Sequence, residues 1–187
     1  WHFWFGYTAF ALLGFRLLWG VLGGRWSRFI SFIYAPSTLL RYLRGKSGAD
    51  EHVEVGHNPL GSFSVFGLLL VLIAQVATGL VADDEIATVG PLHRLVSSDL
   101  ASSATSWHAS YGQWLVFGLV GLHLAAIAYY LLAKKRNLVR PMISGDKTLP
   151  PETPASADGG RQRVMAVVLA LLCVAAVTWV VRLGIAG

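Results

Sequence analysis

The sequence predicts an all-α protein, an integral membrane helical bundle with four spanning helices. Hydrophobic residues make up 55% of its 187 residues and charged residues only 13%, and the mean hydropathy is +0.57. Soluble domains carry about 25% charged residues. Four apolar stretches, 3–21, 63–82, 107–133 and 164–181, approach or exceed the length of about 20 residues that crosses a bilayer. A buried helix in a soluble core is a poor alternative for the last stretch, because nothing else in the chain would cover it.

The basic residues between these stretches indicate how the helices are oriented. Lysine and arginine collect in segments 25–57 and 134–163, whereas segment 83–106 holds only Arg94 against four acidic residues. Cytoplasmic loops of membrane proteins carry an excess of lysine and arginine. We therefore expect the first two segments inside and the third outside. The net charge of +5 then needs no nucleic acid to explain it.

The expected helices have recognisable ends. Gly20, Gly23 and Gly24 interrupt the first apolar stretch just before the headgroup region. In the sequence GHNPLG, Asn58 is a good N-cap and Pro59 suits the first helical position, so the second helix should begin there.

The segments between the helices differ in character. Segment 25–57 mixes aromatic and aliphatic residues with arginines, as an amphipathic piece lying in the inner interface would. Segment 148–163 is rich in proline, glycine and small polar residues and predicts a flexible linker. The expected organisation is a bundle of three spanning helices in 1–147, that linker, and an additional C-terminal spanning helix in 164–187.

A short pattern occurs twice, as WHFWFG at the start of the chain and as WHASYG from position 107. His2 and His108 should lie at similar depth near the outer surface, because each begins a helix that runs inward. Two imidazoles that face each other can ligate a haem iron from both sides. Gly6 and Gly112 lie on the same helix face as these histidines and would leave room for a porphyrin. For either histidine alone, an interhelical hydrogen bond is the alternative, and glycine also permits close helix packing.

A second polar site is expected near the inner surface. His123 follows His108 by fifteen residues, which is about 22 Å along a helix and within about 60° of the same face. Arg16 shares the face of His2, about 21 Å deeper. It would pair with a propionate of an inner haem or extend to the inner headgroups, and both readings stay open. His57, at the start of the second helix, has either a cap or surface role or a quinone or proton-handling role.

The remaining candidates for metal binding are weaker. His52 and His93 are expected to be solvated in connecting segments, and the only cysteine, Cys173, to lie in the core. The sequence has no cluster with zinc-ligand spacing. It also has no C-x-x-C-H motif for covalent haem attachment.

Several stretches resemble the prokaryotic cytochrome b561 and nickel-iron hydrogenase b-type cytochrome family. They are GFRLLWGVLGGRWSRFISFIYAP, GHNPLGS, the helix with two histidines, and NLVRPMISGDK, and they span roughly residues 1–147. The resemblance implies a multi-pass protein of the bacterial inner membrane that binds two b-type haems. His2 and His108 would ligate the outer haem, and His123 the inner one. The family takes the fourth ligand from an earlier helix, so we expect a further N-terminal helix ahead of Trp1.

The resemblance also implies the function and the partners. The protein would relay electrons between the quinone pool and a redox partner, and whether it has quinol or quinone oxidoreductase activity within a complex stays open. A periplasmic c-type cytochrome or redox subunit is the favoured partner, with hydrogenase or dehydrogenase subunits as alternatives, and lipids surround the helices. A structural membrane anchor without redox activity is the second hypothesis. A metal or proton transporter ranks last, since the second and third helices contain no acidic residue.

Overall fold

The computed structural model describes residues 1–46, 55–145, 149 and 151–185. His52 and the expected domain boundary at 147 lie outside these residues. Within the described ranges the regular structure is helical, apart from one antiparallel bridge between Asp83 and Val89. Four of the helices are long and apolar enough to span a membrane. The predicted fold class is therefore confirmed.

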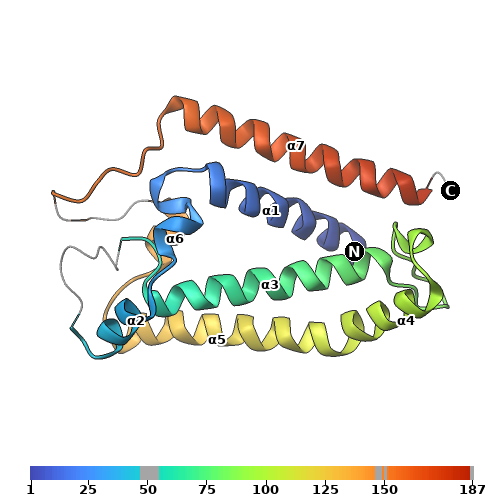
Figure 1. Ribbon diagram of the computed structural model, residues 1–187, viewed down its shortest axis with the longest axis horizontal. Helices are drawn as coiled ribbons and strands as arrows, with labels where there is room; N and C mark the ends of the chain where they lie inside the picture. Colours follow the sequence, from blue (N-terminus) through green and yellow to red (C-terminus); the bar gives the residue numbers. More distant parts are fainter. Residues whose placement is uncertain (47–54, 146–148, 150, 186–187) are drawn as a thin grey trace.

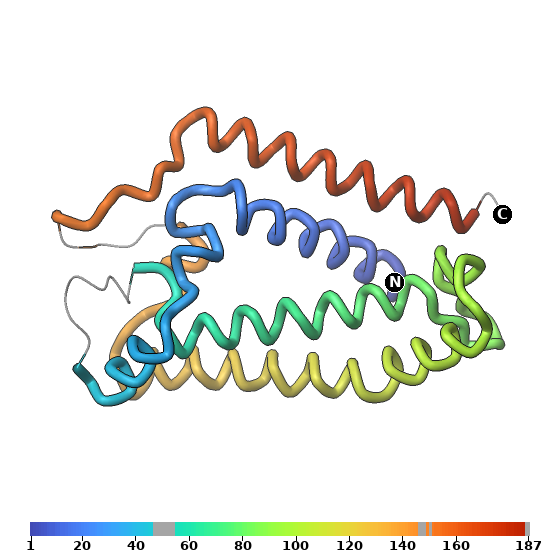
Figure 2. Tube along the Cα trace, in the orientation of Figure 1, coloured from blue at the N-terminus to red at the C-terminus, as the bar shows by residue number. Residues whose placement is uncertain are grey.

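The long helices lie side by side in a row (Figure 1). They are α1 (His2–Leu22), α3 (Pro59–Val81), α5 (Gln113–Leu132) and α7 (Gly160–Ile185). Helix α7 packs on α1, α1 on α3, and α3 on α5. Trp1 and the C-terminal end of α7 lie at the same end of the bundle (Figure 2). We call this the outer end, following the orientation expected from the charges, and the opposite one the inner end.

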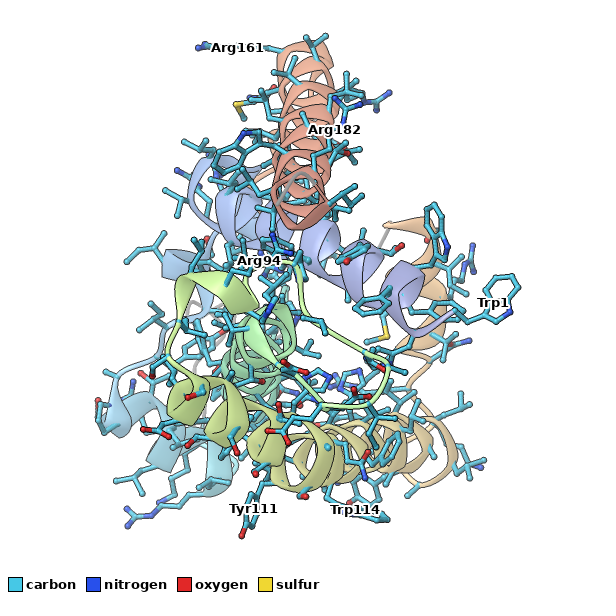
Figure 3. The ribbon with its side chains drawn as sticks, turned by 90° about the vertical axis from the view of Figure 1, so that its right-hand side faces the viewer. Trp1, Arg94, Tyr111, Trp114, Arg161 and Arg182 are labelled. Carbon is cyan, nitrogen blue, oxygen red and sulfur yellow. The ribbon has the colours of Figure 1, made fainter. Side chains whose placement is uncertain are left out.

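Apolar side chains cover the exposed faces of the long helices. Leu70 of α3 is 69% exposed, Leu122 of α5 is 65% exposed and Leu171 of α7 is 64% exposed. In a chain of this composition, helices that are hydrophobic all round are membrane spans. Tyr111 and Trp114 point away from the other helices (Figure 3), so that side of the bundle is available to lipid.

The ends of two helices follow the sequence signals. The side chain of Asn58 caps α3 by accepting a hydrogen bond from the amide of Gly61 at 2.7 Å, and Pro59 occupies the first turn. Helix α1 ends with Gly23 as its C-cap. Cys173 is buried where α7 packs beside Gly14 of α1, as expected for a core residue.

The third span begins earlier than its apolar stretch predicts. One continuous helix comprises α4 (Ser98–Ser106), the π-helical segment η5 (Trp107–Gly112) and α5. The hydroxyl of Ser97 caps its start by accepting from the amide of Leu100 at 3.3 Å. Ala101 and Ala104 are buried, and α4 packs against α3. Helix α4 consists mainly of serine and alanine, so its hydropathy is too low for it to be recognised as part of a span. It nevertheless packs against α3 as a continuation of α5.

Short helices surround the inner end of the bundle. They are η1 (Arg25–Ser27), η2 (Phe29–Phe32), α2 (Pro36–Leu43) and α6 (Val139–Ser144). Part of the expected linker is attached here, because the amide of Arg25 donates to the carbonyl of Ser156 at 2.8 Å. The indole of Trp26 donates to the carbonyl of Pro154 at 2.9 Å. These two bonds connect the segment before α7 to the turn that follows α1.

The loop between α3 and α4 folds back over the outer end of α3. The amide of Gly90 donates to the carbonyl of Ala82 at 2.7 Å, and that of Leu92 donates to the carbonyl of Leu80 at 2.8 Å. The short helix η4 (His93–Leu95) follows. This loop is therefore fixed to the bundle by backbone hydrogen bonds.

Candidate functional site

The outer end of the bundle brings together the two histidines of the repeated pattern. The ring centroids of His2, at the start of α1, and His108, in η5, lie 5.7 Å apart, with the ring planes at 86°. The two residues are 106 positions apart in the sequence. The predicted juxtaposition of His2 and His108 is thus present in the fold.

The π-helical segment sets the direction of the His108 side chain. A π-helix holds more residues per turn than an α-helix, so it rotates the following side chains relative to an uninterrupted helix, and such segments are frequent at functional sites. Here it covers Trp107–Gly112 and separates α4 from α5. His108 therefore lies in the one described segment where the helix of the third span departs from α geometry.

Gln75 of α3 and His108 are joined by two hydrogen bonds. The Nδ1 atom of His108 lies 2.9 Å from the backbone carbonyl oxygen of Gln75, and Gln75 Nε2 donates to the backbone carbonyl of His108 at 2.8 Å. A carbonyl oxygen can only accept, so Nδ1 must carry the proton. The other ring nitrogen, Nε2, is then free to coordinate a metal. Metal-ligating histidines typically have their second nitrogen bonded in this way.

Gly79 of α3 provides the space for the His108 ring. A Cβ atom added at Gly79 would lie 2.6 Å from Cε1 and 3.0 Å from Nδ1 of His108. Any other residue at this position would displace the imidazole. The sequence analysis missed both Gln75 and Gly79 as contributors to this site, because their only sequence signals are a polar residue and a glycine within an apolar helix.

The two glycines of the repeated pattern have different surroundings. Beside Gly6 there is open space, with no atom within 4 Å of an added Cβ. Beside Gly112 the corresponding space holds the side-chain oxygen of Gln75, and Trp107 Nε1 lies 3.0 Å from the Cβ position. In this structure Gly112 therefore allows α3 and the π-helical segment to approach each other.

The outer histidine pair fits a bis-histidine haem. A metal bonds to an imidazole nitrogen at about 2.0–2.1 Å, so two ligands on opposite sides of one metal ion have ring centroids about 6 Å apart. The 5.7 Å separation of His2 and His108 is close to that value. Within the described ranges, no group of three or more histidine, cysteine, aspartate or glutamate residues is placed to hold a metal ion. A haem needs only two axial protein ligands, since its porphyrin supplies the others.

Unpartnered polar atoms mark the same region. In the part of the chain that the structure describes, three buried side-chain polar atoms have no hydrogen-bond partner: His57 Nδ1, Gln75 Oε1 and Trp107 Nε1. Two of them flank Gly112 next to the outer histidine pair. Buried unpaired polar groups are rare and costly, so they commonly mark sites for a ligand or water.

At the inner end, His123 of α5 is half-buried but forms no imidazole pair like that of His2 and His108 among the described residues. The pKa of His57 lies below its ordinary value because of burial, and additionally because of the charges of Arg16 and His123. The structure thus brings three of the predicted site residues into one electrostatic cluster.

The side chain of Arg16 is directed into the turn that follows α1. Its Nη1 donates to the carbonyl of Ser27 at 3.2 Å, and its guanidinium lies 4.8 Å from the ring centre of Phe29 and 5.8 Å from that of Phe32. The ring of Phe32 lies 4.7 Å from that of His57. Aromatic rings and a backbone carbonyl therefore surround the cationic group of Arg16.

Hydroxyl groups complete the inner end. Tyr34 donates to the backbone carbonyl of His57 at 2.7 Å. Asn58 Nδ2 donates to the hydroxyl of Tyr130 at 3.1 Å, and that hydroxyl is hydrogen-bonded to Tyr42 at 3.2 Å. These tyrosines, which the sequence analysis did not single out, connect α2, the start of α3 and α5.

Comparison with known proteins gives one match. The family model described as prokaryotic cytochrome b561 matches residues 1–145. No curated protein and no solved structure matches the chain. The matched region contains His2, His108 and His123 as well as the cluster at the inner end, and only the segment before α7 and α7 itself lie beyond it. The chain therefore belongs to the prokaryotic cytochrome b561 family, whose members are membrane b-type cytochromes that carry haem b and take part in electron transfer.

Proposed function

We propose that the protein relays electrons across the bacterial inner membrane, between the quinone pool and a redox partner, through two bis-histidine haem b groups. The juxtaposition of His2 and His108 at 5.7 Å is the observation that carries the proposal. Membership of the cytochrome b561 family supports it independently. Quinol or quinone oxidoreductase activity would belong to a larger complex.

His2 and His108 are the proposed axial ligands at the outer end. A haem b held there would supply one-electron chemistry. The chain contributes the orientation of the ligands. The carbonyl of Gln75 holds the Nδ1 proton of His108, which leaves Nε2 free to bind a haem iron. Gly6, where there is open space, is proposed to adjoin the porphyrin, and Gly112 to do the same once the Gln75 side chain beside it moves aside.

At the inner end, His123 is the proposed ligand of the second haem. We propose that its partner comes from a further helix ahead of Trp1, as the family pattern implies. Arg16 is positioned in the same electrostatic cluster and is proposed to pair with a haem propionate. His57 is proposed to contact a quinone or to handle a proton, because its Nδ1 is buried without a partner.

The proposed partner at the outer end is a periplasmic c-type cytochrome or redox subunit. Glu85 and Asp99 are exposed and acidic at that end, and complementary charge accelerates association. The double substitution Glu85→Gln with Asp99→Asn should slow electron exchange with a basic c-type cytochrome and weaken its dependence on salt, while the haem spectrum stays the same. An unchanged rate in stopped-flow measurements would exclude this surface as the docking site.

The first test of the function is a dithionite-reduced minus oxidised visible spectrum of the purified chain, with haem quantified per polypeptide. Two b-type haems per chain are expected when the preceding segment is present. One haem that is lost in His108→Ala would leave only the outer site. No haem at all would overturn the proposal in favour of a structural anchor.

A further inference from the structure

A cavity lies at the outer end of the bundle, between α1, α7 and the loop that precedes α4. Its volume is about 1050 Å³, at the upper end of the range of about 300–1,000 Å³ typical of ligand pockets. Apolar side chains of two spanning helices form its walls, among them Phe3 and Leu12 of α1 and Val174 and Val181 of α7. The cavity is thus large enough for part of a lipid.

The loop lines the cavity at its end near the membrane surface. A Cβ atom added at Gly184 of α7 would lie 2.6 Å from Cα of Pro91, so glycine is required for the loop to contact α7 this closely. The neighbouring Gly90 is hydrogen-bonded to the end of α3 through its amide. The loop therefore bridges α3 and α7 and forms one wall of the cavity.

The residues at the mouth of the cavity are basic. His93 and Arg94 of the loop and Arg182 of α7 line it, and no acidic residue does. Figure 3, viewed from this end, shows Arg94 below α7 and Arg182 on it. Among the described residues, neither arginine has an ion pair or a side-chain hydrogen bond with the protein.

Among the described residues, the acidic side chains of the same loop form no ion pair with Arg94 or Arg182. Asp83 accepts a hydrogen bond from the amide of Glu85. Asp84 accepts from the amides of three successive residues of its own loop, Ile86, Ala87 and Thr88. These carboxylates are hydrogen-bonded within the loop rather than to the arginines that line the cavity.

The polarity of the cavity changes along the membrane normal. Arg182 and Val174 are eight residues apart on α7, which corresponds to about 12 Å of helix. The cavity therefore extends from a cationic mouth near the membrane surface into the apolar depth of the span. A ligand that matches it has an anionic head and a hydrocarbon chain.

We propose that this cavity binds one anionic phospholipid of the outer leaflet. The phosphate lies at Arg94 and Arg182, and an acyl chain lies between α1 and α7. Arginine presents a fixed array of donors that suits phosphate oxygens, and basic pockets between spanning helices bind anionic headgroups. The bound lipid would fill the space that separates α7 from the outer half of α1. The proposal does not depend on haem binding.

Native mass spectrometry of the delipidated full chain tests the proposal. Phosphatidylglycerol and phosphatidylcholine with identical acyl chains are added back separately, and retained lipids are counted. One phosphatidylglycerol should be retained with about tenfold preference, because each basic residue contributes severalfold. The preference should disappear in Arg94→Gln with Arg182→Gln. The control Arg161→Gln with Arg163→Gln, at the inner end of α7, should retain it. Persistence in the first variant, or equal loss in both, would overturn the proposal.

A second pair of variants tests the acyl-chain site. Val174→Trp fills the cavity from α7 and should reduce retention of phosphatidylglycerol several-fold. Val167→Trp lies on the same helix face seven residues away, outside the cavity lining, and should leave retention unchanged. If the arginine variant does not reach the helicity of the parent chain in circular dichroism, the two valine variants test the lipid proposal in its place.

Competition distinguishes the alternative occupants. Inorganic phosphate at millimolar concentration should compete only weakly, because it cannot use the apolar walls. Full displacement by phosphate, together with normal retention in Val174→Trp, would indicate a free phosphate site and refute the lipid proposal. Displacement of phosphatidylglycerol by a neutral quinone at equal concentration would refute it as well.

Discussion

At the outer end of the bundle, two imidazoles from different helices face each other, and one of them is oriented by a backbone carbonyl of a third helix. At the inner end, His123 has no such partner in the described part of the chain and lies instead in the field of Arg16 and His57. Both ends are held by hydrogen bonds between helices. They differ in whether the described residues supply both histidines of a facing pair. In the proposed function the described residues supply both ligands of the outer haem, whereas they supply one ligand, His123, of the inner haem.

The largest expected effect comes from removing one histidine of each site. His108→Ala should lower the affinity for the outer haem by at least about 100-fold, since even changes beyond the direct ligands cost 10–100-fold. His123→Ala should remove only the inner haem. Redox titration of the haem absorbance should then show one remaining component, different in the two variants. His93→Ala is the control, and it should keep every component.

Loss of all haem in both variants would break the comparison between the ends. The two sites would then be a single cooperative unit, rather than one complete site and one that needs a further ligand.

Gly79→Ala tests the packing of the outer site without removing a ligand. The added methyl group would lie 2.6 Å from Cε1 of His108, so the ring must move, and the affinity for the outer haem should fall by about tenfold. Gly67→Ala, in the same helix, is the matched control, because nothing lies within 4 Å of its Cβ position. Equal haem content in both variants would show that α3 does not position His108.

Gln75→Leu should have a smaller effect at the same site. It removes the hydrogen bond from Nε2 to the carbonyl of His108 but keeps the backbone carbonyl that orients the ring. A single hydrogen bond contributes about 1 kcal/mol to the free energy of unfolding. We expect a loss of that size and a shift in the midpoint potential of the outer haem. Gln113→Leu, the same chemical change in α5, should leave the potential unchanged.

Much of this architecture is predictable from residue patterns. Hydropathy and length predicted the four spans, and the cap residue Asn58 and the proline after it predicted the start of α3. The matched histidines predicted that His2 and His108 lie together. These features depend on local composition or on equal depth in the membrane. Both can be worked out from the residue types and their positions along the sequence.

Other features depend on contacts that spacing does not contain. The π-helical segment at His108 and the start of α4 at Ser98 arise from packing against α3. Gln75 and Gly79 matter only because α3 lies against His108. Gly112 was predicted to leave room for a porphyrin, and in the fold the space where its side chain would be holds the side-chain oxygen of Gln75. The role of each of these residues depends on which helices pack against each other, and a single sequence does not show these contacts directly.

Tyr130→Phe tests the inner end in the same way. The substitution removes the hydroxyl that accepts from Asn58 and bonds to Tyr42. It should lower the free energy of unfolding by about 1 kcal/mol, as measured in a detergent-based denaturation series. Tyr129→Phe is the adjacent control, and because residue Tyr129 is 54% exposed, the change should be nearly neutral. Equal stability of the two variants would indicate that the inner end is not held by this network.

The smallest effect concerns the loop above the outer site. The Thr88 side chain and the amides of Thr88, Ala87 and Ile86 hold the pKa of Asp84 well below its ordinary value of 3.8. The folded loop therefore binds fewer protons than the unfolded one, and its stability is full above that value and is lost as the pH falls through the lowered pKa. Amide chemical shifts of residues 86–88 should stay constant from neutral pH to below pH 3.8 and change only in stronger acid. A transition at pH 4 or above would contradict this, and Asp84→Asn should abolish the transition. At the inner end, acid should protonate the His57 ring and change its contacts. A loop that keeps its order while those contacts change would show that acid affects the two ends of the bundle differently.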